Sequence, residues 1–232
     1  MEVIILAGGF GTRLKSVVPD LPKPMAPVAN RPFLTYIFEY LKKQGVTRAI
    51  LSTGYKHEVI HSFFGESYKG ISIDYSVEYE PLGTGGAIKK ALDLVNNDQA
   101  FVLNGDTFFD VNLMELLKFH LGYKADLTLS LKTMEEFDRY GVVLTSDDKV
   151  IRFEEKRYVP VGNINGGVYL VNRNLFDDKI WPDKFSFEAD FLERDFGRQS
   201  FYGFISDGYF IDIGIPSDFE KAQLELPRIY EE

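Results

Sequence analysis

Short apolar runs recur through the first half of the chain, separated by longer segments with helical periodicity. We interpret four of these runs as strands, namely residues 2–6 (EVIIL), 48–53 (RAILST), 71–77 (ISIDYSV) and 100–104 (AFVLN). Most of them are nearly continuous rather than alternating, which is typical of strands covered on both faces. This order of strands and helices predicts a parallel sheet with helices on both sides.

The clearest helix is predicted over residues 30–45. Its apolar positions share one helical face and are Phe33, Ile37, Phe38 and Leu41. Asn30 precedes them as the expected N-cap, and Gly45 follows them as the expected stop. Further helices are expected over residues 55–64, 84–95 and 112–121.

The pattern changes after residue 125. Four closely spaced strands are predicted by the runs DLTLSLK, YGVVLT, KVIRFEEK and INGGVYLV. A helix around FEADFLERDF, a strand pair FYGFIS and GYFIDI, and a closing helix from Pro216 complete the expected order. We therefore expect an α/β fold with a Rossmann-like mixed, mostly parallel sheet flanked by helices, forming a single domain over 1–232 with halves 1–124 and 125–232.

Composition excludes several classes of protein and of ligand. Apolar residues make up 45% of the chain and charged residues 26%, which indicates a folded globular protein. No apolar run approaches the about 20 residues of a membrane span, and no signal peptide is recognised, so we expect a cytoplasmic protein without a membrane partner. With no cysteine and three histidines, any metal is expected on oxygen ligands. The net charge of -9 argues against nucleic acid as a partner.

A glycine-rich stretch, LAGGFGTRL at residues 6–14, follows the first predicted strand. In open α/β sheets the loop after this strand is the usual phosphate cradle, and glycines let backbone N–H groups approach an anion. The spacing fits neither a P-loop nor a dinucleotide fingerprint. Arg13 follows the last glycine, and Lys23 stands between two prolines in LPKPM. Either cation could bind phosphate, although a tight turn and solvated surface charges are the plainer alternatives.

Two aspartates end apolar strands at the same expected edge of the sheet. Asp106 lies in VLNGDTFFD and Asp212 in GYFIDIGIP. Each could be a turn or helix cap by itself. Together they suit Mg²⁺, which is usually bound through one or two carboxylates and phosphate oxygens.

The run LAGGFGTRL, followed after eight residues by KPM, resembles the signature of the sugar nucleotidyltransferases, and the resemblance extends along essentially the whole chain. These enzymes join a nucleoside triphosphate to a sugar 1-phosphate and release pyrophosphate. The resemblance implies Arg13 on the departing pyrophosphate, Lys23 near the α-phosphate, and Asp106 and Asp212 as metal ligands. It also implies nucleotide contacts in the glycine-rich stretch, from Leu6, Ala7, Gly8, Gly9, Gly11 and Thr12. The first half would then bind nucleotide and the second half sugar phosphate.

The segment VEYEPLGTGGA, residues 77–87, resembles the family's base-recognition segment, which places Gly83 and Thr84 against the nucleobase. Relatives that use thymidine or uridine nucleotides often have glutamine where this chain has Glu78. A carboxylate only accepts hydrogen bonds, and guanine offers two adjacent donors, so Glu78 favours GTP. An exposed acidic strand end explains Glu78 equally well.

The runs RYGVV, FEEK and INGGVYL match the order and spacing of the family's sugar-phosphate motifs. The resemblance places Gly141 close to the sugar, Lys156 on its phosphate, and Asn165 on a hydroxyl. Glu154 and Glu155 both remain open as the hydroxyl-binding carboxylate, and counting back from the lysine favours Glu155. Arg157 stands where the family usually has proline, and we expect it to face solvent.

Within the family, several runs are most like those of bacterial heptose 1-phosphate guanylyltransferases, which make GDP-heptose for surface glycans. This implies GTP and D-glycero-α-D-manno-heptose 1-phosphate as partners. Enzymes that use mannose, glucose or N-acetylmuramic acid 1-phosphate share most motifs and stay open as alternatives, as does a homodimer. A non-catalytic sensor is disfavoured, because Arg13, Lys23, Asp106 and Asp212 are all present.

Overall fold

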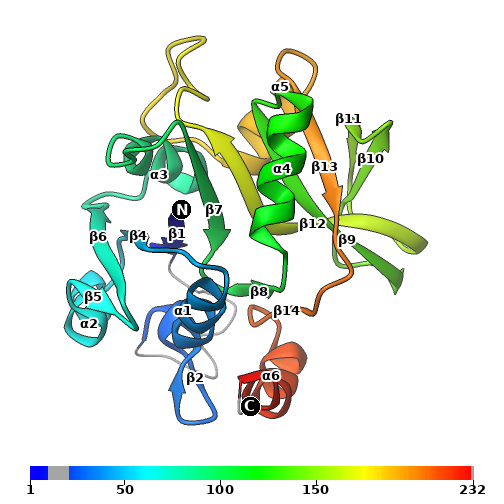
Figure 1. Cartoon of the computed structure of the whole chain (residues 1–232). Helices are drawn as coiled ribbons and strands as arrows, with labels where there is room; N and C mark the ends of the chain where they lie inside the picture. Colours follow the sequence, from blue (N-terminus) through cyan, green and yellow to red (C-terminus); the bar gives the residue numbers. More distant parts are fainter. Residues whose placement is uncertain (10–20, 231–232) are drawn as a thin grey trace.

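A mixed sheet of ten strands runs through the part of the chain described by the computed structural model, residues 1–9 and 21–230 (Figure 1). Across the sheet the strands are β10 (Val142–Ser146), β11 (Lys149–Glu154), β13 (Phe201–Ile205), β9 (Leu127–Phe137), β12 (Val159–Asn172), β7 (Gln99–Asn104), β1 (Glu2–Ala7), β4 (Arg48–Thr53), β6 (Ile71–Val77) and β5 (Ser67–Tyr68). The four strands predicted in the first half are confirmed as β1, β4, β6 and β7.

Parallel pairing is concentrated in the first half. β1 lies parallel to both β4 and β7, and β4 lies parallel to β6. β12 then pairs antiparallel with β7 on one side and with β9 on the other. The two halves of the chain therefore share one sheet, which β12 makes continuous.

Helices cover both faces of this sheet, as the sequence predicts. They are α1 (Phe33–Lys43), α2 (His57–Phe64), α3 (Gly83–Leu92), α4 (Leu113–Tyr123), α5 (Glu193–Asp195) and α6 (Pro216–Tyr230). Alternation along β1 separates two cores: Val3 and Ile5 pack with α1, α2, α4 and α6, whereas Ile4 packs with α3 and the segment that includes α5. A fully buried strand explains why the run EVIIL has no polar face.

The expected N-cap of the first helix is wrong. Asn30 has a positive φ of 65° and lies in the turn between β2 (Pro27–Val28) and β3 (Arg31–Pro32). The helix begins at Phe33 after Pro32, whose side chain supplies no cap. The expected stop is confirmed, because Gly45 has a φ of 75° and donates its N–H to Lys42 O at 3.1 Å.

Two expectations for the second half also need correction. The runs FYGFIS and GYFIDI do form strands, but they do not pair with each other: β13 lies parallel to β9, and β14 (Phe210–Asp212) pairs with β8 (Thr107–Phe109). The helix around FEADFLERDF begins as a π-helix, η3 (Phe187–Leu192), before α5. The rings of Phe187 and Phe191 stack there, with centroids 5.4 Å apart, inside the buried core.

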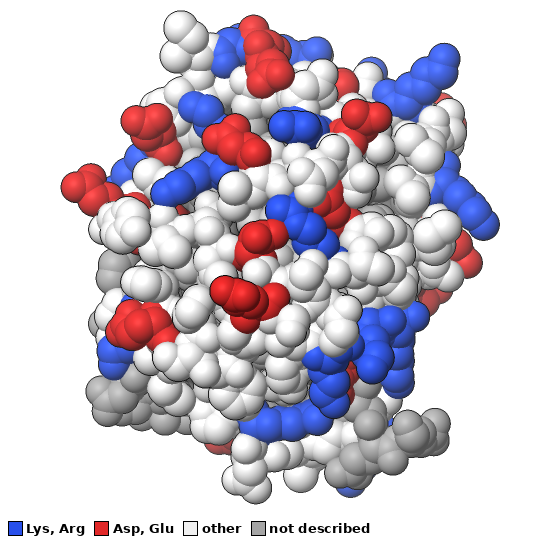
Figure 2. Space-filling model, turned by 60° about the vertical axis from the view of Figure 1, so that its left-hand side comes forward, with Lys and Arg blue, Asp and Glu red and all other residues white. Residues whose placement is uncertain are grey.

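Charges of both signs are interspersed over most of the face in Figure 2, apart from a group of Lys and Arg side chains at its lower right. This mixture accords with the modest net charge of the chain. Within residues 1–9 and 21–230, no helix is long and apolar enough to cross a membrane.

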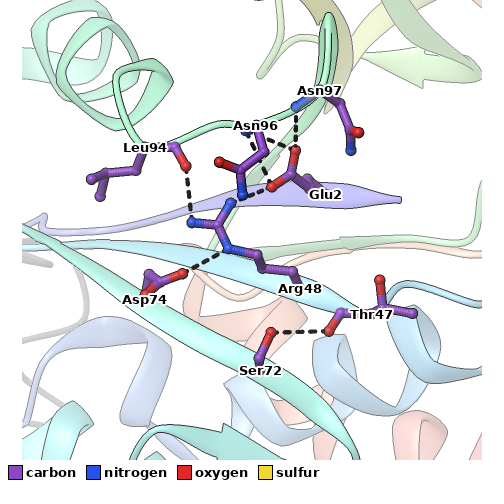
Figure 3. Close-up of polar contacts among 8 residues, drawn as sticks. All are labelled: Glu2, Thr47, Arg48, Ser72, Asp74, Leu94, Asn96 and Asn97. Carbon is purple, nitrogen blue, oxygen red and sulfur yellow. Dashed lines mark hydrogen bonds and ion pairs between the residues drawn. The ribbon is translucent and has the colours of Figure 1, made fainter.

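A partly buried ion pair between Glu2 and Arg48 joins β1 and β4 at their amino-terminal ends (Figure 3). Glu2, only 6% exposed, accepts hydrogen bonds from the Arg48 guanidinium and from the backbone N–H of Asn97 at 2.7 Å. Arg48 also donates to Asp74 Oδ2 at 2.7 Å and to Leu94 O at 2.9 Å. Burial alone would raise the pKa of Glu2, but these donors outweigh it, and the pKa lies below its ordinary value.

We expect Glu2→Gln to lower the free energy of unfolding at pH 7 by about 1–3 kcal/mol, because it weakens hydrogen bonds to a buried charge. A carboxyl with a depressed folded pKa stabilises the fold above its unfolded pKa and loses this effect as the pH falls. The difference should therefore persist down to about pH 4, near the unfolded pKa, and shrink as the pH falls below it through the folded pKa. Urea unfolding measures it, with exposed Glu220→Gln as the control. Equal stability of the two variants at pH 7 would contradict the prediction.

Candidate active site

A cleft of about 1120 Å³ opens where the parallel strands of the first half end. Its walls come from both halves of the chain, which is where ligands bind in open α/β sheets. The predicted site residues that line it are Leu6, Gly8, Gly9, Lys23, Glu78, Gly83, Thr84, Asp106, Lys156, Asn165 and Asp212. The structure thus brings together residues that are up to about 200 positions apart in the sequence.

Other predicted residues lie elsewhere. Gly11, Thr12 and Arg13 fall outside the described residues. Ala7 is fully buried as the last residue of β1, so its side chain packs in the core. Gly141 and Glu155 do not contribute to the lining of the cleft.

Glu78 is held in the cleft wall by two hydrogen bonds. Its Oε1 accepts from Ser52 Oγ at 3.2 Å, and its Oε2 accepts from the backbone N–H of Leu82 at 3.1 Å. A Cβ on Gly8 would lie 2.6 Å from Oε1, so the glycine leaves room for the carboxylate. Glu78 is therefore a positioned acceptor rather than a free strand end.

Lys23 lies between the two predicted metal ligands. Its Nζ is 2.5 Å from Asp106 Oδ2 and 3.7 Å from Asp212 Oδ1, and its side chain is only 13% exposed. Lys23 is the first residue of a short 3₁₀ turn, η2 (Lys23–Met25), and stands between Pro22 and Pro24. Because proline fixes φ, the two prolines restrict the backbone from which Lys23 reaches into the cleft.

The pairing of β8 with β14 places the aspartates side by side. Asp212 lies opposite Thr107, and the N–H of Ile213 donates to Asp106 O at 3.1 Å. Burial raises the pKa of Asp212, and the neighbouring Asp106 charge adds to this rise, whereas Lys23 and the Gly214 N–H oppose it. The pair is thus a concentration of negative charge that one lysine only partly neutralises.

The donor set suits a hard cation that shares its coordination with a ligand. The described part of the chain holds no group of three or more His, Cys, Asp or Glu side chains that could by themselves enclose a metal. Asp106 and Asp212 offer carboxylate oxygens at the cleft surface. Two carboxylates, with the remaining positions left to water and phosphate, are what Mg²⁺ commonly uses.

The double glycine of INGGVYL shapes the part of the cleft wall that the sequence predicts to bind the sugar. Gly167 has a φ of 74°, and the register of β12 against β9 shifts between Asn165 and Tyr169. A Cβ on Gly167 would lie 2.6 Å from the Asn104 amide. Asn165 Nδ2 donates to the Tyr169 hydroxyl at 2.9 Å, which fixes the amide in the cleft wall.

In the other two motifs predicted to bind the sugar, RYGVV and FEEK, Gly141 and Glu154 have structural roles. A Cβ on Gly141 would lie 2.5 Å from Glu154 O, so this glycine permits the close pairing of β10 with β11. Glu154 pairs with Arg157, with Oε2 and Nη2 2.7 Å apart, and Glu155 is exposed. Neither glutamate lines the cleft, whereas Lys156 does.

Several residues in the cleft wall were not selected from the sequence. Arg139 and Tyr140 directly precede Gly141 in RYGVV, so that motif carried a signal for them. Burial raises the pKa of Tyr140 to about 12, and its hydroxyl has no hydrogen-bond partner among the described residues. Glu188, in η3, also lines the cleft, and its sequence context carried no comparable signal.

The cleft residues predicted from the motifs, together with the ten-stranded sheet, identify the class of protein. The profile of the nucleotidyl transferase family matches residues 2–228, and the chain belongs to this family. It is 60% identical over 226 residues to the D-glycero-alpha-D-manno-heptose 1-phosphate guanylyltransferase of Aneurinibacillus thermoaerophilus, a match covering 97% of this chain and 98% of that protein.

Two further relatives agree with this one. The D-glycero-alpha-D-manno-heptose 1-phosphate guanylyltransferase of Campylobacter jejuni subsp. jejuni serotype O:2 is 52% identical over 220 residues, covering 94% of this chain and 97% of that protein. The solved structure of HddC from Yersinia pseudotuberculosis complexed with GMP-PN is similar with a TM-score of 0.86 at 41% identity, covering 96% of this chain and 97% of that one. The predicted mixed sheet flanked by helices is thereby confirmed.

We expect Asp212→Asn to raise the free energy of unfolding at pH 7 without divalent metal. A carboxyl whose folded pKa lies above its unfolded value weakens the fold when ionised, and this penalty fades as the pH falls through the folded pKa. The gain in the variant should therefore shrink towards pH 4, roughly the ordinary carboxyl pKa. Urea unfolding at both pH values tests this, with exposed Asp110→Asn as the control. A loss of stability at pH 7 would refute it.

Proposed function

We propose that this chain transfers the guanylyl group of GTP to D-glycero-α-D-manno-heptose 1-phosphate, releasing pyrophosphate and forming GDP-heptose for a surface glycan. The observation that carries the proposal is Lys23 between Asp106 and Asp212 in a cleft built from both halves. The names of the two guanylyltransferase relatives and the nucleotide analogue in the HddC structure support the choice of GTP and heptose.

The proposed reaction is a direct displacement at phosphorus. A phosphate oxygen of the sugar 1-phosphate attacks the α-phosphorus, a new P–O bond forms, and the bond from the α-phosphorus to the β-phosphate oxygen breaks. No protein nucleophile is required, because the attacking phosphate is already anionic. Lys23 is positioned to stabilise negative charge on the reacting phosphates, and Arg13 is proposed for the departing pyrophosphate.

Asp106 and Asp212 are the proposed Mg²⁺ ligands. When bound there, the ion would neutralise phosphate charge and polarise phosphoryl oxygens. Burial is the main cause of the raised pKa of Asp212, and a bound divalent cation would relieve the Asp106 repulsion that adds to it. Lys23 would then be released from its present pairing with Asp106 to bind phosphate.

The remaining cleft residues divide between base and sugar. Gly8, Gly9, Gly83 and Glu78 are proposed for the nucleotide, with Glu78 accepting from the guanine donors. Lys156 and Asn165 are proposed for the phosphate and a hydroxyl of the sugar. The Thr84 hydroxyl already bonds Phe187 and Glu188, so its proposed contact with the base is through the backbone or methyl group.

A matrix of four nucleoside triphosphates against heptose, mannose, glucose and N-acetylmuramic acid 1-phosphates tests substrate choice. With Mg²⁺, pyrophosphate release is expected to be fastest with GTP and the heptose 1-phosphate. Glu78→Gln should lower kcat/KM for GTP roughly 10- to 150-fold, because a hydrogen bond to a charged group contributes about 1.5–3 kcal/mol.

Glu80→Gln is the matched control, since Glu80 is an exposed glutamate two residues away that does not line the cleft. Its kcat/KM for GTP should stay near that of the wild type. Preference for UTP over GTP would overturn the role of Glu78 and the choice of GTP. Fastest release with mannose, glucose or N-acetylmuramic acid 1-phosphate would overturn the heptose assignment.

Asp106→Asn is expected to reduce kcat at saturating Mg²⁺ by at least about 100-fold, because metal stabilisation of transition-state charge contributes several kcal/mol. Stopped or continuous assay of pyrophosphate release measures the loss. Asp110→Asn is the control, since Asp110 is close in sequence but does not line the cleft. Comparable kcat values for the two variants would remove Asp106 from the proposed metal site.

A further inference from the structure

Glu188 has no role in the reaction described so far, although it faces the cleft. It belongs to η3 in the second half of the chain, and its Oε2 accepts from Thr84 Oγ1 at the start of α3 with a distance of 2.7 Å. The same Thr84 oxygen accepts from the backbone N–H of Phe187 at 2.8 Å. One threonine therefore fixes both the Glu188 side chain and the backbone beside it.

The segment that carries Glu188 is held firmly. Ser186 caps η3 by accepting from the N–H of Ala189 at 3.1 Å, and the Ser186 N–H donates to Asp190 at 2.8 Å. Phe187 is fully buried and meets the Tyr169 ring edge to face, with centroids 5.1 Å apart. These contacts hold the backbone at Glu188 in place, so its carboxylate is preorganised for binding a ligand.

The free acceptor capacity of Glu188 lies in its other oxygen. Within residues 1–9 and 21–230, Oε1 makes no hydrogen bond, while Oε2 bonds Thr84 and accepts from Ser186 Oγ at 3.3 Å. A carboxylate repels phosphate, so its natural partners in this cleft are neutral donors such as hydroxyl groups. A hydrogen bond from a hydroxyl to an ionised carboxylate is also among the stronger ones.

The neighbours of Glu188 indicate which hydroxyl it meets. The negative charge of Glu188 lies close enough to Tyr169 to contribute to the raised pKa of that phenol, after the larger effect of burial. Tyr169 in turn accepts from Asn165, the residue proposed for a sugar hydroxyl. Phe187, next to Glu188 in the chain, packs against the Tyr169 ring, and Glu188, Asn165 and Tyr169 all line the cleft. Glu188 therefore lies in the part of the cleft that is proposed for the sugar.

We propose that Glu188 binds a hydroxyl group of the sugar in the sugar 1-phosphate and so helps to determine which sugar is accepted. This inference rests on the proposed function and takes up the task first assigned to Glu154 or Glu155, neither of which lines the cleft. Thr84 acts as a positioning residue that orients the Glu188 carboxylate. Because Thr84 is also proposed to contact the nucleobase, it would link the nucleotide site to the sugar site.

The test compares Glu188→Gln with Glu193→Gln, an exposed glutamate of the same segment that does not line the cleft. Steady-state pyrophosphate release is measured with Mg²⁺, varying heptose 1-phosphate and GTP in turn. Glu188→Gln is expected to raise KM for the sugar 1-phosphate roughly 10- to 150-fold, the range of a hydrogen bond to a charged group, and to leave KM for GTP within about twofold. Glu193→Gln should match the wild type.

A second arm uses sugar 1-phosphates that each lack one hydroxyl. For one of them the wild type should lose as much kcat/KM as Glu188→Gln loses with the complete sugar, and the variant should lose little more with that analogue. If Glu188→Gln fails to fold, Glu188→Asp keeps the charge but shortens the side chain, and the same rise in KM for the sugar is expected.

The outcomes separate this inference from the proposed function. If the wild type is active and the Glu188 variants behave like Glu193→Gln, the inference is overturned and the function stands. A rise in KM for GTP alone would place Glu188 on the ribose and overturn the assignment to the sugar. If the wild type turns over no sugar 1-phosphate with any nucleoside triphosphate, both fall.

Discussion

The antiparallel pairing of β12 with β7 is the constraint on which the cleft depends. Residues Val168 to Asn172 of β12 pair in register with Leu103 to Gln99 of β7. Because the two strands are antiparallel, the residues just before Val168 lie beside the carboxyl end of β7. The two glycines at that point allow β12 to change register against β9, and Asn104 occupies the space that a side chain on Gly167 would need. One strand thereby brings the second half of the chain against the edge at which the parallel strands of the first half end.

The parallel core was predictable because its signal is local. A strand buried on both faces must be apolar throughout, and this is visible in the runs at residues 2–6, 48–53 and 100–104 without any tertiary information. The N-cap prediction for Asn30 failed because asparagine serves equally well in a left-handed turn and as an N-cap, and Ala29 and Asn30 both have a positive φ in the turn of a short hairpin. Pairing of β14 with β8 depends on the return of the chain across 100 residues, which periodicity does not encode.

The site was predictable to the extent that its residues follow strands. Asp106 and Asp212 could be grouped because each follows an apolar run expected to end at the same edge of the sheet, although β14, which ends in Asp212, forms a separate two-stranded sheet with β8. Lys23 was added to them by the family resemblance, and the structure places it between the two aspartates. The glutamates of FEEK show the limit: alternation along a strand says that they face opposite ways, but it does not say which way is the cleft. Glu188 was missed because it reaches the cleft from a π-helix whose position is set by packing against α3, where Phe185 fills the space beside Gly85.

Positive and negative side chains in the cleft have different proposed ligands. Where phosphates are proposed to react, the chain supplies Lys23 and Lys156 together with two aspartates suited to a cation, so that negative charge is neutralised in a site of limited exposure. Where a base and a sugar are proposed, it supplies Glu78 and Glu188, each already held by a neighbouring hydroxyl. Carboxylates there would oppose phosphate binding in the wrong orientation while accepting donors from neutral groups. Under the proposed function, the same carboxylates would accept hydrogen bonds from the base and the sugar and would exclude misplaced phosphate, so the positions of these acids would help to set how the substrates lie.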